Sequence, residues 1–114
     1  MMACRTLLHG AVAFLIASTA ACEPSVTEVT LMMEEFRFVP SQITVPAGTP
    51  LRLHVQNRGH EPHEFQFPRV FSDAIRIEPG RTAELLITPR PGIQAFRCRI
   101  RGHGGMEGTL IASS

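Results

Sequence analysis

Short runs in which apolar and polar residues alternate fill most of this chain after residue 25. Leu51, Leu53 and Val55, for example, are separated by single polar residues. A period of two predicts strands with one buried face, because successive side chains of a strand point to opposite sides. Pro and Gly interrupt the runs at short intervals, and no window has a clear helical period. The pattern therefore predicts an all-β protein built as an antiparallel sandwich or barrel.

The runs predict nine short strands and one thin hydrophobic core between them. We expect strands at residues 26–33, 36–39, 41–45, 50–57, 63–67, 74–78, 82–88, 93–98 and 107–112. The expected core consists of Phe36, Phe38, Ile43, Val45, Leu51, Leu53, Phe65, Leu85, Ile87, Phe96 and Leu110. These strands predict a single folded domain over residues 27–114.

The first 21 residues are typical of an export signal rather than of the folded domain. A short basic start is followed by an apolar stretch that is shorter than the roughly 20 residues a membrane helix needs. Small residues then lead to Cys22, which resembles the lipidated Cys of bacterial lipoproteins, although Thr19 departs from that motif. Ordinary cleavage after Ala20 or Ala21 is the alternative. Residues 22–26 would form a short tether, and the domain would work in the periplasm or on the outer face of the membrane.

The number of cysteines and the net charge of the chain narrow the classes of function that fit it. Only Cys98 lies inside the expected domain, whereas exported proteins normally pair their cysteines in disulfides. A lone thiol in an oxidising compartment therefore suggests a bound metal. The formal net charge is +1, and loss of Arg5 with the signal brings it to about zero. This balance offers nothing to attract nucleic acid.

The chemistry concentrates near the end of the chain, where Cys98, His103 and Met106 lie within nine residues. Sulfur and imidazole together select copper, and two His and one Cys in a plane with a weak axial Met form the blue-copper ligand set. The second His is either His60 or His63. His63 alternates with Phe65, which we place in the core, so its side chain should share the buried face with Cys98. We therefore expect one copper ion held by His63, Cys98 and His103, with Met106 as the axial ligand.

Several motifs together resemble those of small bacterial cupredoxins over residues 27–112. They are Phe36-x-Phe38-x-Pro40, Ile43-x-Val45-x-Ala47-Gly48, Asn57 followed by His63-Glu64-Phe65, Pro79-Gly80-x-Thr82, Phe96-x-Cys98, and Gly102-His103 followed by Met106-x-Gly108. The resemblance implies a Greek-key β-sandwich of seven or eight strands. It also implies a mononuclear copper site that serves electron transfer or copper handling.

The chain departs from the family pattern around the expected site. Arg101 replaces the usual Pro before Gly-His, and the spacing of His103 and Met106 is short. Glu64 follows His63 where many blue-copper proteins have Asn. Glu64 is thus an alternative to Met106 as the axial ligand. Domains of iron-uptake proteins share this His-Glu pair, so iron is an alternative metal.

These features predict a periplasmic type 1 copper protein that carries single electrons. A copper (or iron) carrier in metal homeostasis, using the same residues, is the alternative. We expect no enzymatic activity from this domain alone. A binuclear copper centre would need a second Cys in the loop, and one short domain cannot supply the second copper site of a multicopper oxidase or a nitrite reductase. Arg97, Arg99 and Arg101 lie beside the ligands and suggest an acidic redox partner that docks near His103. A membrane would be contacted only through a lipid on Cys22.

Overall fold

The structure, a computed structural model, describes residues 25–71, 73–100 and 102–114. The expected export signal, Cys22 and Arg101 lie outside the described residues, so the predicted domain boundaries stay a prediction. No helix in the described part of the chain is long and apolar enough to cross a bilayer.

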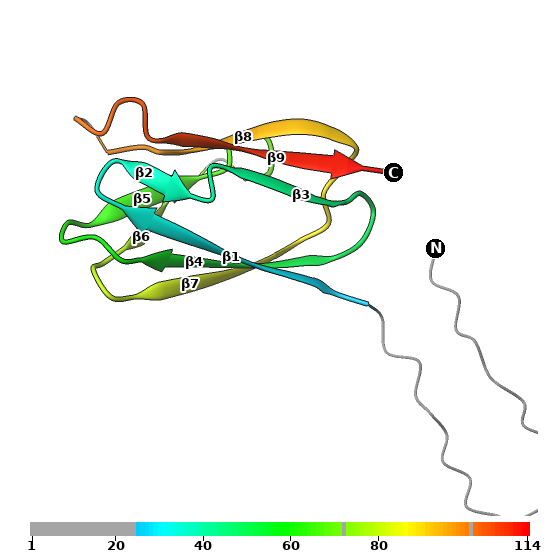
Figure 1. Ribbon diagram of the computed structural model, residues 1–114, viewed down its shortest axis with the longest axis horizontal. Helices are drawn as coiled ribbons and strands as arrows, with labels where there is room; N and C mark the ends of the chain where they lie inside the picture. The colour runs from blue at the N-terminus through cyan, green and yellow to red at the C-terminus, as the bar shows by residue number, and fades with distance from the viewer. Residues whose placement is uncertain (1–24, 72, 101) are drawn as a thin grey trace, which may run out of the picture.

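Nine strands form two sheets that face each other (Figure 1). Every strand begins and ends within one residue of its predicted range, because Pro and Gly turns limit each apolar run. The strands are β1 (Thr27–Glu34), β2 (Arg37–Val39), β3 (Gln42–Pro46), β4 (Leu51–Asn57), β5 (His63–Gln66), β6 (Ile75–Ile77), β7 (Thr82–Ile87), β8 (Gly92–Cys98) and β9 (Glu107–Ser113). The expected all-β Greek-key sandwich is confirmed, with nine strands rather than seven or eight.

The strand order is β2-β1-β4-β7 in one sheet and β3-β9-β8-β5-β6 in the other. Most ladders are antiparallel, as the pattern predicted, and two, β1 with β4 and β3 with β9, are parallel. The chain crosses between the sheets after β2 and again after β3, which makes strands distant in sequence neighbours in space. Such crossovers permit parallel pairs that a hairpin cannot form.

Phenylalanines fill the core between the sheets. Phe65, Phe67 and Phe96 are fully buried, and the Phe38 ring meets the Phe96 ring edge-on at 5.0 Å. The prediction that Phe36 lies in the core was wrong, because its side chain is 50% exposed. It lies with Glu35 in the two-residue turn between β1 and β2 and has a φ of 64°, which takes it out of the strand alternation.

The remaining predicted core residues follow the alternation of their strands. Leu85 and Ile87 on the edge strand β7 are half-buried against the core rather than enclosed by it. The other eight are buried: Phe38, Ile43, Val45, Leu51, Leu53, Phe65, Phe96 and Leu110. The core is therefore continuous up to the end of the sandwich where β5 begins and β8 ends.

Candidate metal centre

Strand pairing brings His63 and Cys98 together. β5 runs antiparallel to β8, and Phe65 lies directly opposite Cys98. Because alternate side chains share a face, His63 points to the same side as Phe65, and Cys98 to the same side as Phe96. His63 is fully buried and Cys98 is 7% exposed. The predicted placement of both side chains at one pole of the core is confirmed.

The loop after β8 returns His103 and Met106 to Cys98. The N–H of His103 donates to the carbonyl of Ile100 (3.1 Å), and the N–H of Met106 donates to the carbonyl of His103 (3.2 Å). The N–H of Cys98 donates to the carbonyl of Met106 (3.0 Å), which closes the loop. His103 and Met106 are both buried. The backbone therefore holds the loop against the core.

Three donor atoms meet in this buried pole. Nδ1 of His103 lies 3.4 Å from Cys98 Sγ and 3.3 Å from His63 Nδ1, and the third side of the triangle is 3.8 Å. A point equidistant from the three atoms lies about 2.0 Å from each, the length of a bond between imidazole nitrogen and a first-row metal such as zinc. A thiolate–metal bond is longer, about 2.3 Å, so an ion shared by the three side chains would lie slightly off this point, away from Sγ.

The donor set fits a single copper ion. Two imidazoles and one thiolate are ligand types that bind copper, and the soft thiolate selects it over harder metal ions. Burial lowers the pKa of His63, and the nearby His103 lowers it further. His63 is therefore held in the neutral form that binds a metal. Within the described residues its Nε2 has no hydrogen-bond partner, so this ring is held by packing and by the contacts of its Nδ1 with His103 and Cys98.

The two candidate axial ligands lie in different places. Met106 is buried and lines the same surface depression as Cys98 and His103. Glu64 follows His63 on β5 and therefore faces the opposite side of the sheet, where its carboxylate lies 4.0 Å from the guanidinium of Arg76. This position favours Met106 over Glu64 as the fourth ligand.

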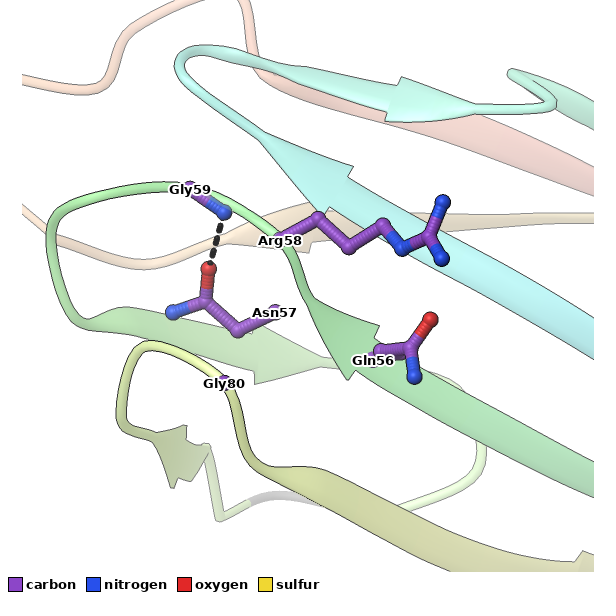
Figure 2. A pocket seen from close by; sticks show the side chains of 5 residues that line it. All are labelled: Gln56, Asn57, Arg58, Gly59 and Gly80. Atoms are coloured by element: carbon purple, nitrogen blue, oxygen red, sulfur yellow. Dashed lines mark hydrogen bonds between the residues drawn. The ribbon is translucent and has the colours of Figure 1, made fainter.

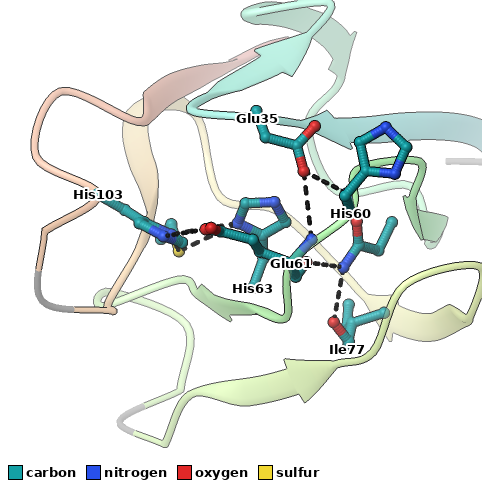
Figure 3. Close-up of polar contacts among 8 residues, drawn as sticks. Glu35, His60, Glu61, His63, Ile77 and His103 are labelled. Carbon is teal, nitrogen blue, oxygen red and sulfur yellow. Dashed lines mark hydrogen bonds and ion pairs between the residues drawn. The ribbon is translucent and has the colours of Figure 1, made fainter.

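A different carboxylate, which sequence reasoning missed, touches the site. Glu61 Oε2 lies 3.2 Å from His103 Nε2, the ring nitrogen that is not part of the donor triangle (Figure 3). The exposed Phe36 ring packs edge-on against the same imidazole, with centroids 4.9 Å apart. Nothing local in the sequence indicates that either residue reaches His103.

Asn57 and Glu35 shape the loop that carries Glu61. The Asn57 side chain donates to the carbonyls of Glu61 (2.8 Å) and Ile77 (2.9 Å) and accepts from the N–H of Gly59 (2.8 Å; Figure 2). Glu35 accepts hydrogen bonds from the N–H groups of His60 and Glu61, and the former holds the pKa of its carboxyl below the usual range. The shallow pocket of Figure 2 lies on this loop and includes none of the three donors.

The other predicted residues are placed as follows. His60 lies exposed on the loop and is not part of the donor group, so the choice of His63 over His60 agrees with the geometry. Arg97 and Arg99 are exposed on the edge of the site, and Arg97 Nε donates to Gln66 Oε1 at 2.9 Å.

Comparison with known proteins assigns this chain the cupredoxin fold that its two sheets suggest. A sequence profile of the cupredoxin-like domain matches residues 6–112. Dithionite-reduced auracyanin of Roseiflexus castenholzii superimposes with a TM-score of 0.67 at 18% identity, over 81% of this chain and 100% of that chain. The metal-binding domain of the Cu(I)-exporting P-type ATPase CopA of Streptococcus pneumoniae D39, solved with Cu(I), gives 0.69 at 17% identity over 81% and 90%. A comparison with curated protein sequences found no match.

Blue copper oxidase of Nitrosomonas europaea also shares the fold. Its TM-score is 0.66 at 22% identity, over 78% of this chain and 39% of that chain. The same sandwich therefore occurs in a small copper protein, in a domain of a transporter and in part of an oxidase. The fold alone therefore does not identify the function of this chain, which must be inferred from the residues of the site.

Proposed function

The chain belongs to the cupredoxin-like family, and from that premise we propose that it is a type 1 copper protein that carries single electrons. The observation that supports this most is the triangle of His63 Nδ1, Cys98 Sγ and His103 Nδ1, with sides of 3.3–3.8 Å, in a buried pole of the sandwich. Copper bound there supplies a one-electron change between Cu(I) and Cu(II). The residues set the conditions for that change.

The protein's contribution is rigidity. His63 and Cys98 project from neighbouring strands, and the loop to His103 is closed by backbone hydrogen bonds, so the donor separations are fixed by the fold. A planar set of three donors suits neither oxidation state fully, and little has to move when the charge of the ion changes. We assign Met106 as the weak axial ligand.

We further propose that the protein works outside the cytoplasm, in the periplasm or on the outer face of the membrane, and is not itself an enzyme. Its partner would be a redox protein that approaches the surface around His103. Arg97 and Arg99 on that surface favour an acidic partner, whereas the half-exposed Glu61 beside the imidazole opposes one. The positive charges of Arg97 and Arg99 and the negative charge of Glu61 would therefore favour one orientation of the partner on this surface.

A carrier of copper, or of iron, is the second candidate. The fold it shares with the Cu(I)-bound domain of the exporting ATPase supports this role. The two functions use the same residues and differ in whether the ion is retained. An electron carrier keeps its ion in both oxidation states, while a metal carrier must release it.

Copper titration of the purified metal-free protein separates the candidates. For an electron carrier we expect one equivalent of Cu(II) to give an intense blue or green charge-transfer band and a reversible voltammetric wave. A pale protein that binds Cu(I) tightly and shows no reversible wave would support the metal carrier instead.

Three variants test the ligand assignment. Cys98→Ala should abolish the band, because the thiolate is the source of the charge transfer. His63→Gln should weaken or abolish it, whereas His60→Gln should keep it. A band that survives loss of Cys98, or that depends on His60 rather than His63, would show that the donors are misassigned.

A further inference from the structure

The outer edge of His103 carries a contact that the ligand set does not require. Glu61 Oε2 lies 3.2 Å from Nε2 of this imidazole, whose other nitrogen faces Cys98 and His63. Among residues 25–71, 73–100 and 102–114, no carboxylate meets Nε2 of His63. The two expected imidazole ligands therefore differ in how they are held, and Glu61 accounts for the difference.

The chemistry of the contact fixes where the proton of the neutral ring lies. An ionised carboxylate only accepts hydrogen bonds, so Nε2 of His103 must be the donor. In a neutral imidazole the other nitrogen, Nδ1, then has a free lone pair. That lone pair is the one a metal ion needs.

The opposite tautomer has a competing partner. If Nδ1 carried the proton, it would donate to Cys98 Sγ at 3.4 Å, and both groups would be blocked for metal binding. Glu61 thus acts against donation of a hydrogen bond from His103 Nδ1 to the sulfur of Cys98. Its effect exists before any ion is bound.

Glu61 is itself held in place from both sides of its backbone. Its N–H donates to Glu35 (3.2 Å), and its carbonyl accepts from Asn57 Nδ2 (2.8 Å). Gly59 makes the approach of Glu35 feasible, because a Cβ at that position would lie 2.5 Å from Glu35 Oε1. The backbone of Glu61 is therefore fixed by the loop at a position from which its carboxylate reaches His103 (Figure 3).

We propose that Glu61 is a positioning residue that holds His103 in the tautomer with the proton on Nε2, so that Nδ1 is ready to bind the ion together with His63 and Cys98. This inference deepens the proposed function and rests on it for the identity of the ion. Carboxylates that orient ligating imidazoles raise metal affinity in many metalloproteins, and their loss typically costs about 10–100-fold.

The test compares Glu61→Ala and Glu61→Gln with Glu64→Gln. The last variant removes one carboxylate charge beside His63, but from the face that points to Arg76. The first measurement is the ¹⁵N spectrum of the His103 ring in metal-free protein at about pH 8, where a free imidazole is neutral. The second is the Cu(II) dissociation constant of each variant.

We expect the proton on Nε2 in the wild type and in Glu64→Gln. Glu61→Ala should shift it toward Nδ1 and weaken Cu(II) binding by about 10–100-fold. Glu61→Gln should fall between, because an amide oxygen still accepts a hydrogen bond. Since Glu61 is half-exposed on a loop, we expect all three variants to fold.

The two proposals fail in different ways. If His103 keeps the wild-type tautomer in Glu61→Ala, the positioning role is wrong, whatever copper does. If the wild type binds no copper, the proposed function is wrong, while the metal-free spectrum still decides the role of Glu61. Equal loss of affinity in Glu61→Gln and Glu64→Gln would reduce Glu61 to a through-space charge and overturn the proposal.

Discussion

Each residue of the donor triangle is oriented by a different kind of neighbour. His63 is fixed by packing, because it is fully buried and its Nε2 has no partner in the described part of the chain. Cys98 is fixed by its strand and by the hydrogen bond from its N–H to the carbonyl of Met106. His103 is fixed by Glu61 and Phe36, which approach its ring from two loops. Exposed side chains thus touch the ring of the third donor directly.

Met106 provides a test at the scale of a single side chain. Met106→Leu keeps the size and burial of the side chain but removes the thioether sulfur. We expect the coloured Cu(II) form to persist and its reduction potential to rise, because a weak donor that stabilises Cu(II) is lost. Voltammetry and the visible spectrum check this. An unchanged spectrum and potential would remove Met106 from the site.

At the scale of elements, the site depends on how closely β8 and β9 pack. Gly108 on β9 lies opposite Phe96 on β8, two residues before Cys98. A Cβ on Gly108 would overlap the Phe96 ring and lie 2.7 Å from the carbonyl oxygen of Ser41. Only glycine lets the Phe96 ring lie flat over this position. The strand that carries Cys98 is thereby held in register.

Gly108→Ala should consequently lower the free energy of unfolding by about 1–3 kcal/mol, the usual cost of overpacking a core. Urea denaturation of the metal-free protein measures the change. Gly104→Ala is the matched control, because a Cβ at that position of the ligand loop meets no atom within 4 Å. Equal stability of Gly108→Ala and the wild type would contradict the close packing described for β9.

At the scale of the whole molecule, one aromatic core joins the two sheets and ends at the donor triangle. Phe38 from the four-stranded sheet meets Phe65 and Phe96 from the other sheet, at 6.1 Å and 5.0 Å between centroids. The ligands are attached to the rim of this core rather than to a separate subdomain. Metal binding and global stability should therefore be linked through the buried imidazole of His63.

The pH dependence of stability measures this link. Burial lowers the pKa of His63 in the folded protein below the ordinary value of 6.5. As pH falls below about 6.5, the unfolded chain takes up a proton that the folded protein does not, so the free energy of unfolding decreases, by at most about 1.4 kcal/mol per pH unit. The contribution is fully present above that pH.

Urea denaturation of metal-free wild type and His63→Gln between about pH 8 and pH 5 isolates the effect, since the two proteins differ in this titrating group. We expect the wild type to lose more stability than the variant as the pH falls. Parallel curves for the two proteins would show that His63 does not titrate as the buried site requires.

Local patterns predicted much of this molecule. Alternation was sufficient to find each strand and to place His63, Cys98 and the core phenylalanines on one face, because strand faces follow from sequence parity alone. Phe36 has the same spacing from Phe38 but was misplaced, since a turn with positive φ interrupts the alternation there. The contact between Glu61 and His103 joins residues 42 positions apart and depends on how two loops meet in space.

The proposed function requires that His63, Cys98 and His103 bind one copper ion together. X-ray absorption at the copper edge of the loaded protein tests this most directly. We predict two nitrogen scatterers and one sulfur scatterer within about 2.0–2.3 Å, the bond lengths that imidazole and thiolate make to a metal of this size. A first shell of nitrogen and oxygen without a short sulfur contribution would contradict the claim.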